Sequence, residues 1–296
     1  IIISNMIDFN SKDFGKSFKT LRLDRGYSIN DLADNILSPS ALRKFEEGLV
    51  DPSFTKVLML LDRMHLGADE FIKFSLPNYF PEYKAFLVEV GESYNNNDVK
   101  TMKRIYQRES DLFRENSEFF YLIAASTVAA LIKNLEANFV VEKNIIDNLS
   151  DYLMKVEIWG DFQILIFGNC SMIIPSKTIY LISKELFHKT KKLRSINDNL
   201  HNTIAALENG IEITSDRREY ELAKELLDLL SDFNIPSDEL LLRFKFSFFK
   251  NLFFKKQAEA IKLNNQLIET LRLMNSNQLA SAYDEYMSTF YQNKLS

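Results

Sequence analysis

Residues 28–48 read SINDLADNILSPSALRKFEEG, and this stretch decides the fold of the N-terminal part of the chain. Apolar residues recur in it at every third or fourth position, in one series after Ser28 and a second after Ser38, which is the spacing of amphipathic helices. Each serine can cap a helix by accepting a hydrogen bond from a backbone N–H, and Asp31 would complete a capping box with Ser28. Pro39 suits a first helical turn, where its missing N–H needs no partner. The stretch therefore predicts two short helices joined by a tight turn.

Three further helices are predicted around this pair. The segment before it carries Phe14, Phe18 and Leu21 on one face of a helix. A fourth helix is expected after the pair, and a short fifth one over residues 69–74. In the second, third and fourth helices, the side chains expected to be buried are Ile29, Leu32, Ala33, Ile36, Leu42, Phe45, Leu49, Phe54, Val57, Leu58 and Leu61. We therefore expect a five-helix domain over residues 11–73.

The third of these helices presents small polar and basic side chains away from its predicted core. Arg43 or Lys44 can reach guanine or a phosphate, and Ser40 is short enough to contact a base edge or a phosphate. Ala41 allows a close approach to DNA or touches the methyl group of thymine. Two short helices with such a surface match a reader of the DNA major groove. The residues expected to contact DNA are Ser28, Ser38, Ser40, Ala41, Arg43 and Lys44.

The first helix is locally basic, as expected of a helix that flanks DNA phosphates. Its basic residues are Lys12, Lys16, Lys19, Arg22 and Arg25, and its acidic ones are Asp13 and Asp24. The whole chain has a formal net charge of −5, so any contact with DNA must be local. The alternative is that the five-helix domain merely packs against the rest of the protein, with Arg43 and Lys44 as an ordinary solvated face.

The pattern of this segment resembles the Xre-type helix-turn-helix family. The residues that carry the resemblance are Gly15, Leu21, Arg22, Ser28, Leu32, Ala33, Ser38, Ser40, Phe45, Glu46 and Gly48. Two positions depart from the family, because Ile29 replaces a common Gln and Glu47 replaces a common Arg. Both departures weaken contacts with phosphates or bases, so the resemblance implies modest affinity for DNA unless two copies bind together.

Beyond Pro77 the composition changes to long amphipathic helices. Helix pairs are predicted to begin near Phe80, Glu118, Trp159, Asn197, Pro236 and Ser276. A period of about 40 residues is typical of two-helix solenoid repeats. The segments that begin at Tyr220 and Gln257 are similar to second helices of tetratricopeptide repeats. We therefore expect an all-α protein, with a linker at 74–80 and a right-handed tetratricopeptide-like array over 81–296. Residues 1–10 are interpreted as a tag remnant or a disordered N-terminus.

A second resemblance covers most of the chain. Residues 159–171 read WGDFQILIFGNCS, and residues 60–62 and 69–71 read LLD and DEF. Together these pieces resemble the Rgg/GadR/MutR family of Gram-positive regulators. The resemblance implies a homodimer that binds promoter DNA and is controlled by a short hydrophobic signalling peptide. Some relatives carry a crosslinking Cys where this chain has Phe54, so a covalent dimer is not expected.

The same resemblance suggests where the peptide would bind, namely on the concave surface of the array. Asn169 is the best candidate, because an amide can both donate to and accept from a peptide backbone. Met172 stands where several relatives have Arg, so apolar contact should replace a charged one at that point. Asn202, Phe246 and Asn251 lie on predicted first helices and are weaker candidates. Buried amides in helical arrays more often have a structural role.

Other function classes lack the residues that they need. No phosphate-binding loop, nucleophile elbow or metal-ligand spacing occurs, and the three histidines are scattered. We therefore expect no catalytic site, metal or cofactor. The lone Cys170 in an apolar run favours a buried packing thiol, and without a long apolar run the chain is expected to be cytoplasmic. The runner-up interpretation is a helical-repeat interaction protein, or a regulator that answers to a protein partner instead of a peptide.

Overall fold

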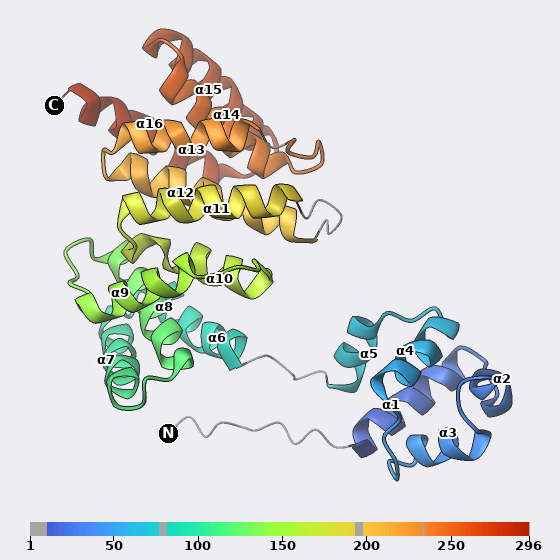
Figure 1. The fold of residues 1–296 in the computed structure, drawn as a ribbon. Helices are drawn as coiled ribbons and strands as arrows, with labels where there is room; N and C mark the ends of the chain where they lie inside the picture. Colours follow the sequence, from blue (N-terminus) through green and yellow to red (C-terminus); the bar gives the residue numbers. More distant parts are fainter. Residues whose placement is uncertain (1–10, 77–81, 193–197, 233, 296) are drawn as a thin grey trace. The chain divides into compact units, whose positions relative to one another are not determined.

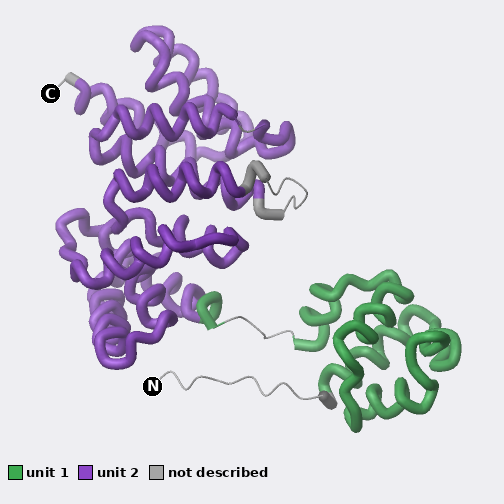
Figure 2. Tube along the Cα trace, in the orientation of Figure 1, with its two compact units in different colours: residues 1–85 green, residues 86–296 purple. Residues whose placement is uncertain are grey.

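A computed structural model describes residues 11–76, 82–192, 198–232 and 234–295. Within these ranges every regular element is helical, which confirms the all-α class. The chain divides into two compact units, residues 1–85 and 86–296, which are coloured separately in Figure 2. The proposed tag remnant at 1–10 and most of the predicted linker at 74–80 lie outside the described residues.

The first unit contains the five predicted helices and the beginning of a sixth. Their bounds are α1 Ser11–Asp24, α2 Ile29–Ala33, α3 Pro39–Glu46, α4 Phe54–Arg63 and α5 Ala68–Ser75. Both expected caps form, because the Ser28 hydroxyl accepts from the N–H of Asp31 and the Ser38 hydroxyl from that of Ala41. The Asp31 side chain accepts the Ser28 hydroxyl hydrogen at 2.5 Å, an interaction between two side chains that the capping-box prediction did not include.

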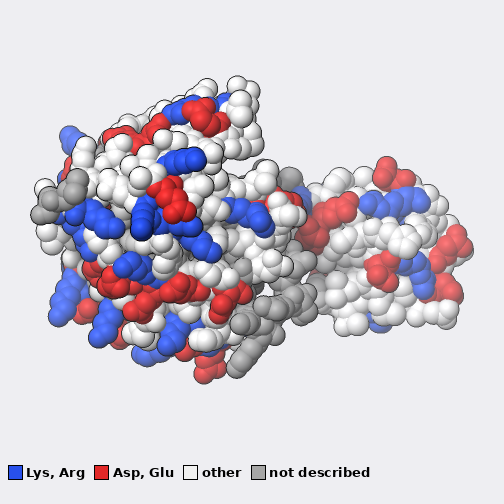
Figure 3. Space-filling view, turned by 90° about the horizontal axis from the view of Figure 1, so that it is seen from above, with Lys and Arg blue, Asp and Glu red and all other residues white. Residues whose placement is uncertain are grey.

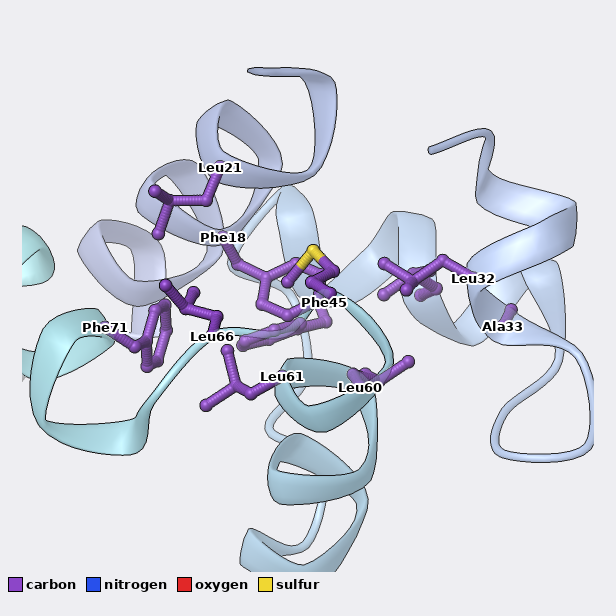
Figure 4. Packing of buried hydrophobic residues seen from close by; sticks show 11 residues of the cluster. Phe18, Leu21, Leu32, Ala33, Phe45, Leu60, Leu61, Leu66 and Phe71 are labelled. Carbon is purple, nitrogen blue, oxygen red and sulfur yellow. The ribbon is translucent and has the colours of Figure 1, made fainter. Parts of the chain in front are cut away.

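The core of this unit is built around three phenylalanine rings. Phe18 on α1 packs with its ring centroid 5.2 Å from that of Phe45 on α3 and 6.1 Å from that of Phe71 on α5. Figure 4 shows these rings surrounded by aliphatic side chains from the other helices. A single core therefore joins all five helices. Its three buried rings contribute a large share of the packing free energy.

Three side chains expected in this core are exposed instead. Leu49 is 67% exposed because α3 already ends at Glu46, and Gly48 turns the chain away with a φ of +71°. Phe54 is 70% exposed and Leu58 is also exposed, since α4 is buried mainly toward its C-terminal end. The predicted burial of these three residues is therefore wrong.

The second unit is a series of helix pairs. The first helices are α6 Glu82–Asn95, α8 Phe119–Leu135, α10 Asp161–Cys170, α12 Asp198–Asp216, α14 Leu240–Phe254 and α16 Asn277–Leu295. The second helices are α7 Val99–Asn116, α9 Lys143–Met154, α11 Ser176–Lys192, α13 Tyr220–Ser231 and α15 Gln257–Leu273, with a short 3₁₀ turn, η1, at Ser171–Ile173. Each first helix begins within a few residues of the predicted position, which confirms the repeat spacing.

Successive pairs pack through equivalent helices. The first helices α8, α10, α12 and α14 contact one another in that order, and so do the second helices α9, α11 and α13. Figure 1 shows α11 to α14 side by side in sequence order. Among the described helices, none combines the length and apolar character that crossing a bilayer requires. The array therefore has one surface formed by first helices and another formed by second helices.

Candidate DNA-contacting helix and inner surface of the repeat domain

A buried ion pair holds α3 against α1. The guanidinium of Arg22 donates to both carboxylate oxygens of Glu46, at 2.5 and 2.9 Å, and to the carbonyl oxygen of Tyr27 at 2.7 Å. Both charged residues are about 95% buried. The hydrogen bond to Glu46 is the main reason that the pKa of Arg22 is raised. This two-point contact fixes the position of α3 relative to α1.

Gly15 lets the two helices approach closely. A Cβ atom at this position would lie 2.1 Å from the carbonyl oxygen of Phe45, which is far inside van der Waals contact. Because the obstructing atom belongs to the backbone, the clash could be relieved only by moving α1 or α3. Gly15 therefore contributes to the placement of α3 together with the ion pair described above.

A third constraint acts on the turn between α2 and α3. Arg63, at the end of α4, donates to the carbonyl oxygens of Asp31, Leu32 and Asp34, at 3.3, 3.0 and 2.6 Å. These oxygens lie at the C-terminal end of α2, where helical partners are missing. Sequence reasoning missed Arg63, because nothing in the local pattern links it to a segment about 30 residues earlier.

The expected DNA-contacting residues lie mostly on one exposed part of the first unit. Ser38, Ser40, Arg43 and Lys44 are exposed on and beside α3, and Ala41 is half-buried. Ser28 is also exposed but lies at the start of α2. Because the hydroxyls of Ser28 and Ser38 already cap helices, Ser40, Arg43 and Lys44 are the side chains best placed to bind DNA.

The basic flank on α1 is smaller than predicted. Arg22 was expected to face phosphates, but its side chain is buried and paired, so this prediction is wrong. Arg25 forms an ion pair with Glu70 at 3.2 Å. Lys16 and Lys19 are exposed and form no ion pair with any described residue, whereas the side chain of Lys12 lies outside the described residues. Two lysines thus remain available to phosphates.

In the second unit, an arginine side chain holds the segment that follows Asn169 through backbone carbonyl oxygens. Arg217, just after α12, donates to the carbonyl oxygens of Met172 and Ile174, both at 2.7 Å. Asn169 is the second-last residue of α10 and is half-buried, and Met172 in η1 is also half-buried. Trp159 packs its ring against Phe167 and is buried. Most of the WG…GNCS motif therefore forms α10, and Asn169 and Met172 are partly exposed where this helix passes into η1.

The other peptide-binding candidates have different surroundings. Asn202 is exposed on α12, and Phe246 is half-buried on α14 with the Lys250 ammonium 5.3 Å from its ring centroid. The amide of Asn251 donates to Asn264 at 2.9 Å, and Asn264 donates to the carbonyl oxygen of Phe248. This arrangement favours a structural role for Asn251, because its amide joins α14 to α15.

Cys170 lies in the core of the second unit. Its side chain is fully buried, and burial raises the pKa of the thiol to about 12. A thiol that stays protonated at neutral pH is a poor nucleophile and a poor metal ligand. In the part of the chain that the structure describes, no three His, Cys, Asp or Glu side chains are placed to hold a metal ion.

Three carboxylates form a stripe along α12, which we call the acidic stripe: Glu208, Glu212 and Asp216. Their spacing of four residues puts them on one helix face. The opposite face carries Gly210, whose position is packed against side chains of α11 and α13. The acidic stripe therefore points away from the second helices, toward the side of the array formed by first helices.

The acidic stripe lies close to two first helices that follow it in sequence. Glu208 and Glu212 are near Lys245 on α14, and Tyr283 on α16 is near both carboxylates. Burial is the main cause that raises the pKa of all three carboxyls, and that of Glu208 reaches about 8. Sequence reasoning missed this stripe, because acidic residues at helical spacing usually mark a solvated face.

A cleft of about 280 Å³ adjoins the end of the acidic stripe. Asp216 lines it from α12, Tyr220 from α13, and Tyr286 and Phe290 from α16. The Tyr286 hydroxyl donates to the hydroxyl oxygen of Ser215 at 2.9 Å, which links the last helix to α12. The end of the acidic stripe thus adjoins a hollow with a carboxylate in its wall.

Comparison with known proteins identifies the family. Residues 106–285 match the C-terminal domain of the HTH-type transcriptional regulator Rgg, which is more than half of the chain. The chain belongs to the Rgg family of transcriptional regulators. Residues 18–71 of this Rgg-family protein also match the helix-turn-helix family, in agreement with the capped pair α2 and α3.

Several solved structures have the same fold. The Streptococcus dysgalactiae SHP pheromone receptor Rgg2 is 21% identical, with a TM-score of 0.76 over 93% of this chain and 99% of that one. A protein of Listeria monocytogenes EGD-e described as a transcriptional regulator is 16% identical, with a TM-score of 0.77 over 96% and 99%. A PrgX/cCF10 complex is 14% identical, with a TM-score of 0.72 over 95% and 92%. These likenesses confirm the helical repeat fold.

Replacing Arg22 with Ala should destabilise the first unit by about 3–5 kcal/mol, because Glu46 would remain buried without its partner. Hydrogen exchange of the amides in α1 and α3 of the full chain measures this loss. The control is Arg25→Ala, which breaks a partly exposed ion pair and should cost less than about 1 kcal/mol. Equal losses in the two variants would show that the buried pair does not hold α3.

Replacing Glu208 with Gln should stabilise the protein at pH 8 by about 1–3 kcal/mol and have no such effect near pH 4. Burial raises the folded pKa from 4.5 to about 8, so folding favours the protonated carboxyl. The destabilisation of the folded state by Glu208 is therefore absent below pH 4.5, grows as the pH rises, and is complete above pH 8. Thermal unfolding against pH measures it, with exposed Glu221→Gln as the control; a gain independent of pH would contradict this account.

Proposed function

We propose that this Rgg-family protein is a cytoplasmic DNA-binding regulator whose activity is controlled by a short peptide bound on the inner surface of its repeat domain. The observation that carries the proposal is the pairing, in one chain, of an exposed and rigidly held α3 with an Rgg C-terminal domain over residues 106–285. The first supplies a surface for DNA, and the second supplies a stack of helices that suits an extended ligand.

In this proposal α3 enters the DNA major groove. Arg43 and Lys44 contact guanine or phosphates, Ser40 contacts a base edge or a phosphate, and Ala41 permits the close approach. Lys16 and Lys19 on α1 bind neighbouring phosphates. Basic and acidic residues are equal in number over residues 11–76, and they intermingle on the face that Figure 3 shows. Affinity must therefore come from a few contacts.

Few contacts per chain favour a homodimer that reads two half-sites, and we include this in the proposal. Such half-sites lie about 34–36 Å apart, one turn of DNA. A second copy also explains the apolar side chains that remain exposed on this unit, which are Leu49, Val50, Phe54, Leu58 and Met59, because exposed apolar groups of this kind mark interfaces. The stoichiometry of the DNA titration below should then be two chains per site.

Replacing both Arg43 and Lys44 with Ala should weaken binding to promoter DNA by about 10- to 100-fold. It should also reduce the slope of log affinity against log salt by roughly 2, as two phosphate-neutralising charges are lost. Fluorescence anisotropy with labelled DNA from upstream of the gene, between low and physiological salt, measures both quantities.

The matched control removes two positive charges from the repeat domain, by Lys224→Ala with Lys255→Ala. Lys224 pairs with Glu221 on α13, and Lys255, just after α14, pairs with Glu259 at the start of α15. This variant should bind DNA like the wild type. If the two double variants lost the same affinity, α3 would not be the DNA-contacting helix.

The peptide part of the proposal is supported by solved structures of the same fold, one of which is described as a complex of a bacterial peptide pheromone with its receptor. Rgg2 is described as a pheromone receptor, and PrgX has been solved in complex with cCF10. For this chain we propose a short signalling peptide, with Asn169 bonding to its backbone and Met172 making apolar contact. Asn202 and Phe246 are secondary candidates, whereas Asn251 already has an amide partner.

Replacing Asn169 with Ala should weaken peptide binding by about tenfold, as expected for the loss of one or two hydrogen bonds. The probes are synthetic peptides of five to ten residues encoded by the short reading frames beside the gene, titrated into the full chain by calorimetry. Asn251→Ala is the informative comparison, because it should lower thermal stability without a specific effect on the peptide. Unchanged binding by Asn169→Ala would remove this residue from the site.

A further inference from the structure

We propose that the acidic stripe and its adjoining cleft bind a cationic nitrogen of the signalling peptide, either its amino-terminal ammonium or a lysine side chain. This inference rests on the proposed peptide-binding function, and it adds a charged anchor to the apolar recognition expected near Met172.

The acidic stripe has one carboxyl group more than the basic groups that act on it, which are Lys245 beside Glu208 and Glu212 and Arg217 beside Asp216. Glu208, Glu212 and Asp216 share one face of α12, and successive members are about 6 Å apart along the helix axis. Lys245 is the basic residue of α14 whose charge reaches Glu208 and Glu212. It forms no ion pair within 4 Å among the described residues. In the free protein the remaining carboxyl group keeps its proton, and a ligand cation would replace that proton.

Glu208 carries the strongest sign of a missing partner. It is 1% exposed, and neither of its carboxyl oxygens has a hydrogen-bond partner of good geometry among the described residues, although the backbone N–H of Phe246 lies near enough to favour the charged form. Its carboxylate lies among Glu212, Lys245 and Tyr283, so it points into the same group of side chains. Burying an ionised carboxylate without a partner is costly, so this carboxyl group stays protonated in the free protein. A cation bound beside it would be the partner that allows it to ionise.

The two remaining carboxylates are open to a ligand. Glu212 is half-buried and Asp216 is exposed, yet surrounding protein still raises the pKa of both. This combination is expected on a concave surface, where a side chain reaches solvent but has protein on several sides. Cations bind strongly in such places, because the low local dielectric increases the attraction between opposite charges.

The cleft beside Asp216 fits one residue of a peptide. Its volume is about 280 Å³, and its wall includes the aromatic rings of Tyr220, Tyr286 and Phe290. Aromatic faces attract ammonium groups and also pack against an aliphatic stem. The Tyr286 hydroxyl donates to Ser215 and lies within reach of Asp216, and all three residues line the cleft. These contacts fix the wall that a ligand side chain or chain terminus would meet.

An organic cation suits this arrangement better than a metal ion. A metal ion requires its ligands to converge within about 2–3 Å of one point, and no three carboxylates or histidines of the described chain are placed in this way. Carboxylates spread along α12 instead suit an ammonium with three N–H donors, followed by a peptide that runs along the helix.

The test uses the full chain and the peptides of the calorimetric titration, each in three forms. These forms have a free amino terminus, an acetylated amino terminus, or norleucine in place of each lysine. The form that removes the anchoring charge should bind about tenfold more weakly, so acetylation and norleucine distinguish the two sources of the cation. A peptide that binds equally in all forms would overturn the inference while leaving peptide control intact; no binding in any form would overturn both.

Variants of the stripe locate the charge on the protein. Glu212→Gln and Asp216→Asn should each weaken binding of the peptide that keeps its anchoring charge by about threefold to tenfold. They should have little effect on binding of the form whose charge is removed. Asp228→Asn, an exposed carboxylate on the second helix α13, is the control and should change neither. If the variants weakened charged and uncharged forms equally, their effect would be structural and the inference would be wrong.

Proton release gives an independent readout. At pH 7 Glu208 is mainly protonated, since its pKa is about 8, and a bound cation should drive this proton off. Calorimetry in buffers with different ionisation enthalpies should therefore detect release of up to one proton per peptide in the wild type, and almost none in Glu208→Gln. Equal proton release in the two proteins would contradict a role for Glu208.

Discussion

The bidentate ion pair between Arg22 and Glu46 is the contact on which the DNA-binding surface depends. It joins α1 to α3 inside the core of the first unit, where neither side chain has water to replace its partner. Gly15 permits the same approach, because any side chain there would meet the carbonyl oxygen of Phe45. With α3 held in this way, the side chains that it exposes keep a fixed geometry, which sequence-specific contact with DNA requires.

Most of the fold could be predicted from the sequence, because its signals are local. Ser28, Ser38 and Pro39 mark helix starts through hydrogen bonds within one turn, and the repeat period places the first helices of the array within a few residues. Burial was predicted less well, since it depends on where a helix ends and on what packs against it. Phe54 follows the helical pattern, yet α4 is buried mainly at its other end.

The functional residues show the same division. The exposure of Ser40, Arg43 and Lys44 follows from helical periodicity, and it was predicted. The burial of Arg22 depends on a partner 24 residues away in sequence. The burial of the acidic stripe on α12 depends on partners more than 30 residues away. A charge pattern on one helix cannot reveal such partners. For this reason Arg22 was misassigned to the phosphate-facing surface, and Glu208 was not recognised as a buried group.

Control of DNA binding by a peptide requires that the two ligands influence each other through the protein. Thermodynamic linkage makes this influence reciprocal, so it can be measured from either side. The most direct measurement is the affinity of the full chain for its peptide, in the absence and in the presence of saturating promoter DNA. We expect the two affinities to differ by about fivefold or more, with the same factor for DNA affinity with and without peptide. Equal peptide affinities in the two conditions would contradict control of this regulator by a peptide.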